Sequence, residues 1–180
     1  ASAFAPHKKE HYAFLTSDEL PEFFRTLNTY SGSSVVKLAM RLQILTGLRP
    51  GELRQGEWIE IDFDKRLWEV PPARMKKRRP HCVPLSDQAI AILEQLRLVT
   101  GNYRFIFPGR IQHSKPMSEM AMNVLIRRIG YAGRVTGHGF RHTMSTILHE
   151  QGYNTAWIET QLAHVDKNSI RGTYNHAQYI

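Results

Sequence analysis

The stretch Thr46-Gly47-Leu48-Arg49-Pro50-Gly51-Glu52-Leu53 separates two kinds of hydrophobic pattern in this chain of 180 residues. Before it, residues 33–46 repeat apolar side chains at helical spacing, and Gly47 suits the carboxyl-terminal cap of that helix. Pro50 fits the first turn of a short helix that opens near Arg49. After the stretch the apolar residues alternate, which is typical of strands. The stretch therefore joins a helical region to a small sheet.

Three extended runs follow, and together they predict a three-stranded antiparallel sheet. The runs cover about 59–63, 67–70 and 81–85, and Asp64-Lys65 makes the turn between the first two. Between the last two lies a basic hairpin with the sequence Arg74-Met-Lys-Lys-Arg-Arg79.

Helices account for most of the remaining chain. Thr16 and Glu19 form a capping-box pattern before a helix over about 20–27, and Ser86 caps a helix that ends at Gly101. Further helices are expected at about 118–130, 139–151, 154–163 and 167–174. The predicted fold class is α+β, mostly α-helical with a small three-stranded antiparallel sheet.

The composition excludes several classes of protein. At 42% hydrophobic the chain can build a core, yet no apolar run approaches the about 18–20 residues that a membrane span requires, and no secretory leader is visible. The single cysteine, Cys82, cannot form an internal disulfide or a multi-cysteine zinc site, so a reducing cytoplasm fits best. The formal charge of +8 favours a polyanion such as nucleic acid as partner.

The domain organisation predicted is one domain over 16–180, preceded by a linker or domain edge over 1–15. Residues 1–15 show no clear element and lack an initiator Met, so we expect the chain to be part of a longer protein.

Two groups of polar residues leave alternatives open when each is taken alone. The four adjacent cations from Lys76 to Arg79 fit a solvated turn or a phosphate contact. His138 and His142 have the spacing of a helical zinc pair, but Gly139 stands where a metalloprotease has Glu and no nearby Cys or Asp completes a site. We therefore expect no metal site.

Three further features also allow two interpretations when each is taken alone. His138 and Arg141 would share a helix face, either as an ordinary surface pair or as a proton carrier beside a phosphate-binding cation. Arg49 either caps its helix with Glu52 or is held by Glu52 for a ligand. Tyr174 is either a buried aromatic or a nucleophile, which would need cations to stabilise its phenolate.

Taken together and in order, these motifs resemble the catalytic domain of tyrosine recombinases, the phage integrase family. The resemblance covers about 46–176 and is carried by Thr46–Leu53, the basic hairpin, Gly137-His-Gly-Phe-Arg-His142, Leu162-Ala-His164 and Tyr174-Asn-His176. The hairpin's continuation, Arg79-Pro-His-Cys-Val-Pro-Leu85, is especially similar to prophage and genomic-island integrases.

The resemblance implies six active-site positions, which are Arg49, Lys76, His138, Arg141, His164 and Tyr174. The two arginines would clamp the scissile phosphate, Glu52 would support Arg49, and Tyr174 would be the nucleophile. Lys77 is the alternative to Lys76, and Tyr179 is the alternative to Tyr174, because the spacing from His164 to Tyr174 is one residue longer than is commonest in the family. Lys77, Arg78 and Arg79 would contact the DNA backbone.

The function implied is site-specific recombination through a 3′-phosphotyrosyl intermediate, without metal or cofactor, which integrates or excises a prophage or mobile element. The implied partners are double-stranded DNA attachment sites, a tetramer in the full-length protein and accessory DNA-bending proteins, with N-terminal DNA-binding domains absent from this chain. The alternatives are a DNA-binding module of the same fold without catalysis, a tyrosine-type topoisomerase, and an α-helical interaction domain. The complete set of polar positions argues against a binding module without catalysis and against an interaction domain. The sequences of the motifs and the chain length argue against a topoisomerase.

Overall fold

The computed structural model describes residues 12–75 and 78–163. Within these residues the helices are α1 (Leu20–Thr29), α2 (Ser34–Thr46), α3 (Pro50–Arg54), α4 (Asp87–Thr100), α5 (Ala121–Arg128), α6 (Gly139–Glu150) and α7 (Thr155–Gln161). The strands are β1 (Ile61–Asp62), β2 (Leu67–Val70) and β3 (His81–Pro84), and short 3₁₀ turns cover Ser17–Glu19, Trp58–Glu60 and Pro72–Arg74. The predicted fold class is confirmed.

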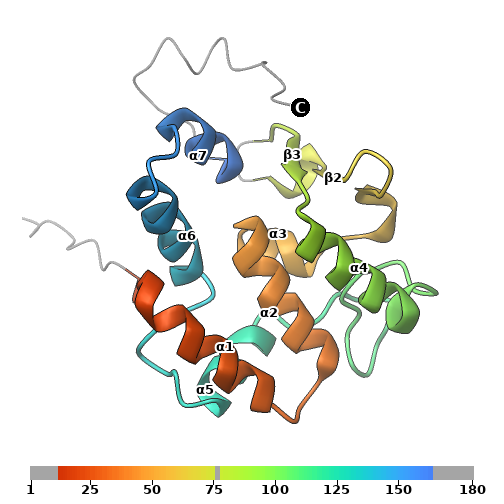
Figure 1. Cartoon of the computed structure of the whole chain (residues 1–180). Coiled ribbons are helices and arrows are strands. Elements are labelled where there is room, and N and C mark those ends of the chain that lie inside the picture. Colours follow the sequence, from red (N-terminus) through yellow and green to blue (C-terminus); the bar gives the residue numbers. More distant parts are fainter. Residues whose placement is uncertain (1–11, 76–77, 164–180) are drawn as a thin grey trace, which may run out of the picture.

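Helix α2 lies at the centre and contacts α3, α4, α5 and α6 (Figure 1). Its ends follow local rules, since the Ser33 hydroxyl accepts from the Val36 amide and Gly47 takes a left-handed φ of 66° at the cap. Ala39, Met40 and Leu42 are fully buried on it. The residues that follow α2 are therefore attached to a helix that packs against four others.

The sheet has the order β1-β2-β3 with antiparallel pairing. Trp68 pairs with Val83 and Val70 with His81. These four side chains are buried on one face, whereas Cys82, which alternates with them, is exposed. The alternation therefore places His81 inside the domain.

The strand predicted over 59–63 is wrong in its first part. Trp58–Glu60 is a 3₁₀ turn, the strand covers only Ile61–Asp62, and Ile59 is 89% exposed. The reason is tertiary, because Trp58 is held by two hydrogen bonds, from its amide to the Arg104 carbonyl and from its indole to the Thr100 carbonyl. The helix predicted at 167–174 lies outside the described residues.

Residues just before α1 cross the amino end of α6. The Leu15 amide donates to the Thr143 hydroxyl at 3.1 Å, and Leu15 is buried in the core. The Ala13 carbonyl accepts from the Thr136 amide and fills the space that a Cβ at Gly139 would need. The domain boundary at residue 15 stays a prediction. None of the helices in the described ranges is long and apolar enough to span a membrane.

Candidate active site

Arg49 and Glu52 pair with each other at the start of α3. Arg49 is the cap residue, and Pro50 follows it at the first helical position. Glu52 accepts twice from Arg49, at 3.1 Å from the amide and 2.7 Å from Nη1. The Glu52 side chain is 4% exposed and that of Arg49 is 24% exposed, so the acid is enclosed while the guanidinium keeps an open side.

Arg141 lies in the first turn of α6 and is only 6% exposed, so the surface alternative is wrong for it. Its Nη1 donates to the Gly47 carbonyl and its Nη2 to the Leu162 carbonyl, the latter at 2.5 Å. Burial, followed by the nearby charge of Arg49, lowers the pKa of Arg141 to about 10, while Glu52 raises it. Arg141 is therefore still a cation at neutral pH, and three of its five N–H donors lie outside these two bonds.

His138 is the residue from which α6 begins. Its ring packs against Tyr12 with 4.9 Å between ring centroids. Burial lowers the pKa of His138, and the charges of Arg141 and Arg49 lower it further. A neutral imidazole beside two guanidinium groups can accept a proton at pH 7.

A zinc site on this helix is not supported by the geometry. His142 is exposed and faces Phe14 at 6.0 Å between ring centroids. In the described part of the chain, no group of three or more His, Cys, Asp or Glu side chains is placed to hold a metal ion.

Four of the positions predicted from sequence lie in one cluster. Arg49 and Glu52 act electrostatically on both His138 and Arg141. These four residues come from α3 and from the start of α6. Lys76, Lys77, His164, Tyr174 and Tyr179 lie outside the described residues.

His81 also belongs to this cluster, although the sequence motif Arg79–Leu85 that contains it predicts no role for it. It is 7% exposed, and its Nε2 lies 3.1 Å from the Gln161 carbonyl oxygen. Burial lowers its pKa, and Glu52, Arg141 and Arg49 all act on it. The sequence does contain a signal for the inward position of His81, because it falls on the apolar side of the alternating strand pattern.

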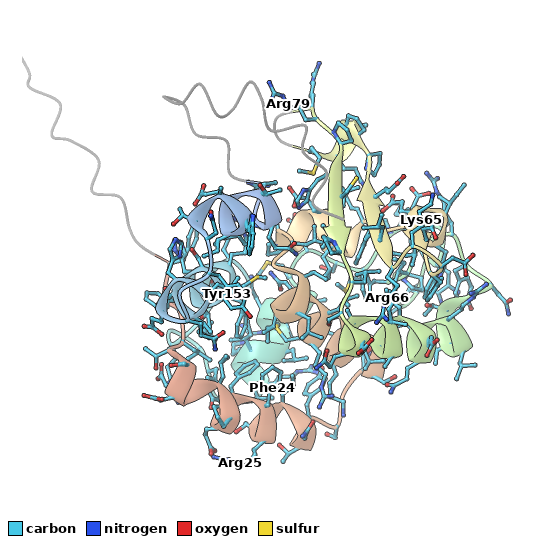
Figure 2. All side chains as sticks on the ribbon, turned by 45° about the horizontal axis from the view of Figure 1, so that its top comes forward. Phe24, Arg25, Lys65, Arg66, Arg79 and Tyr153 are labelled. Atoms are coloured by element: carbon cyan, nitrogen blue, oxygen red, sulfur yellow. The ribbon has the colours of Figure 1, made fainter. Side chains whose placement is uncertain are left out.

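The basic hairpin divides into an inward and an outward part. Arg74 points inward, forms an ion pair with Glu60 and donates to the Glu52 carbonyl at 3.3 Å. Arg78 and Arg79 are exposed, and Figure 2 shows Arg79 projecting beyond the end of the sheet. Among the hairpin residues that the structure describes, Arg78 and Arg79 are therefore the cations open to a polyanion.

Comparison with known proteins gives one consistent picture. The model of the phage integrase family matches residues 13–179. The chain is 41% identical to prophage integrase IntA of Escherichia coli K12 over 99% of its own length and 43% of that protein. It is 42% identical to the integrase of Shigella phage Sf6 over 100% of its length and 47% of that protein. The chain thus spans less than half of these relatives.

Solved structures share the fold. The Tn1549 transposon integrase in complex with a circular intermediate DNA superposes with a TM-score of 0.75 at 17% identity, over 90% of this chain and 61% of that one. A lambda integrase tetramer bound to a Holliday junction gives 0.68 at 19% identity, over 93% and 52%. The predicted recombinase catalytic fold is confirmed.

Proposed function

The chain belongs to the phage integrase family, and from this premise we propose that it is the catalytic domain of a tyrosine site-specific recombinase. In this proposal the domain covers 16–180 and breaks and rejoins DNA to integrate or excise a prophage or mobile element. The observation that carries it is the convergence of Arg49, Arg141 and His138 around the buried Glu52.

The two arginines suit a phosphodiester whose non-bridging oxygens gain negative charge during cleavage. Each guanidinium is already held, Arg49 by a carboxylate and Arg141 by two backbone carbonyls. Donors that are fixed in advance stabilise a transition state by about 2.7–4 kcal/mol each in measured cases. The two guanidinium groups can therefore stabilise the negative charge on the phosphodiester, and the proposal needs no metal or cofactor.

The remaining steps involve His138 and residues outside the described ranges, and they are proposals from the family resemblance. The Tyr174 hydroxyl attacks phosphorus and forms a 3′-phosphotyrosyl bond while the bond to the 5′ oxygen breaks. His138 takes the tyrosine proton, Lys76 protonates the leaving 5′-hydroxyl, and His164 stabilises the phosphate. A 5′-hydroxyl from another duplex reverses the step without ATP, because the covalent link keeps the bond energy.

The proposed partners are double-stranded attachment sites, contacted along the backbone by Lys77, Arg78 and Arg79. The outward position of Arg79 supports this contact. We also propose that the full-length protein acts as a tetramer on DNA with accessory DNA-bending proteins in the bacterial cytoplasm. The lambda integrase tetramer on a Holliday junction, which shares the fold, supports the assembly.

Covalent capture on a nicked suicide DNA tests the proposal. We expect the chain to form a denaturant-resistant adduct, Tyr174→Phe to abolish it with little loss of DNA affinity, and the matched variant Tyr179→Phe to retain it. The reverse result for the two tyrosines would move the nucleophile to Tyr179. DNA binding without any adduct would leave a binding module of the same fold.

Chelation tests the mechanism separately. Adduct formation should survive excess EDTA, because the cations of the site are side chains. Loss of cleavage on chelation would instead indicate a metal-dependent nuclease.

A further inference from the structure

The carboxyl end of α7 is held by donors from two other elements. The last carbonyls of any helix lack partners inside it, so they need donors from elsewhere. His81 of β3 lies within hydrogen-bond distance of the Gln161 carbonyl, and Arg141 of α6 donates to the Leu162 carbonyl. The Gln161 side chain donates in turn to the Thr46 carbonyl at the end of α2, at 2.9 Å.

The partner of His81 fixes the state of its ring. A carbonyl oxygen only accepts, so Nε2 must carry the proton. Burial and the charges of Arg141 and Arg49 lower the pKa of His81, which keeps the ring neutral at pH 7. The ring thus supplies a donor without placing a third full positive charge beside the two arginines.

The anchored carbonyls lie directly before a sequence position that matters for the proposed function. His164 follows Leu162 by two residues, and the carbonyl of Leu162 accepts a hydrogen bond from Arg141. A shift of the end of α7 would therefore move a partner of Arg141 as well as the start of the segment that leads to His164 and Tyr174.

We propose that His81 is a positioning residue for DNA strand cleavage, whose Nε2–H holds the Gln161 carbonyl and thereby aligns the end of α7 with Arg141. This inference rests on the proposed recombinase function. His81 acts through the backbone and not on the DNA, so its loss should slow the chemical step without weakening DNA binding.

Two substitutions separate the donor from the bulk of the ring. His81→Leu removes the donor, whereas His81→Gln places a neutral N–H near the position of Nε2. Misplacement by about 1 Å costs up to about 100-fold in rate, so we expect His81→Leu to cleave about 10–100-fold more slowly in single turnover at saturating DNA. His81→Gln should recover most of that loss, and the dissociation constant for DNA should change by less than about threefold in both, because no DNA-contacting charge is altered.

Val83→Ala is the matched control, since Val83 is buried on the same face of β3 and has no bond to α7. It should destabilise the domain yet cleave at about the wild-type rate while folded. Hydrogen exchange of the amides of α7 gives a readout that needs no activity, and only His81→Leu should accelerate it by more than its loss of global stability accounts for.

The outcomes are distinguishable. The inference fails if His81→Leu cleaves at the wild-type rate, if Gln rescues no better than Leu, or if Val83→Ala slows cleavage equally. A wild-type chain that forms no adduct overturns the proposed function, and with it the role in cleavage, while the exchange experiment still shows whether His81 holds α7.

Discussion

Two arginine–glutamate pairs, one at the start of α3 and one between the turns Trp58–Glu60 and Pro72–Arg74, differ in what the arginine can still reach. In the pair Arg49–Glu52 only the acid is enclosed, whereas in Arg74–Glu60 the side chains are 13% and 7% exposed and both partners are enclosed. The Trp68 indole also donates to Glu60 at 2.9 Å. In the first pair the buried acid holds an arginine that stays open on one side. In the second pair both partners are buried, so the pair can only stabilise the interior.

The two pairs are also connected. Arg74 donates to the Glu52 carbonyl, so the internal pair supports the backbone of the open one. Burial raises the pKa of Glu60, and the attraction of Arg74 and the Trp68 hydrogen bond only partly oppose this. A buried ion pair of this kind gains little net free energy, but removal of one partner leaves an uncompensated charge.

Removal of Arg74 should give the largest effect. Arg74→Ala leaves Glu60 buried without its cation, so the free energy of unfolding should fall by about 3–5 kcal/mol in urea titrations. The double variant Arg74→Met with Glu60→Leu should regain most of that loss, because neither charge is then buried. A loss of less than about 1 kcal/mol in the free energy of unfolding for Arg74→Ala would show that this pair contributes little to stability.

Replacement of Arg49 by Lys should affect cleavage far more than folding. Lysine keeps the charge beside Glu52 but loses the planar fork that fits phosphate oxygens, so single-turnover cleavage should slow by about 100-fold. The free energy of unfolding should change by less than about 1 kcal/mol. Arg54→Lys, on the same helix and bonded to the Met117 carbonyl, is the matched control and should cleave at about the wild-type rate.

A smaller effect is expected from Trp68→Phe. This change removes the indole donor to Glu60 and part of a fully buried side chain, so unfolding should become easier by about 1–3 kcal/mol. The pKa of Glu60 should rise further, because a hydrogen bond to its ionised form is lost. Cleavage by the folded protein should be unchanged, and a larger loss of cleavage than of stability would contradict the separation of the two pairs.

The smallest effect is a shift in histidine titration, measured by NMR. Glu52 raises the pKa of both His81 and His138, so Glu52→Gln should lower both values, since a neutral partner no longer favours the imidazolium. Glu60→Gln should shift both histidines less, because Glu60 is not among the main groups that act on them. Equal shifts from the two variants would place Glu60 in the same electrostatic unit.

Much of the fold could be predicted because its signals are local. The caps at Gly47 and Ser86 depend on residues within a turn, and the structure confirms both. The strand at 59–63 failed because the contacts of Trp58 with Thr100 and Arg104 come from far along the chain. No local pattern contains that information.

The candidate site divides in the same way. Arg49 and Glu52 are neighbours in sequence, and their pairing could be predicted. His81 and Arg141 act on α7 through backbone carbonyls 80 and 21 residues away, and carbonyls carry no sequence identity. The inward position of Arg74 was equally hidden, because its partner Glu60 lies outside the basic hairpin.

The crossing of residues 12–15 over α6 has a mechanical consequence. The Ala13 carbonyl occupies the space above Gly139, and Tyr12 rests on His138. Tyr12 and Ala13 therefore couple the position of residues 12–15 to that of the first turn of α6, so a displacement of this segment would remove the ring that packs against His138.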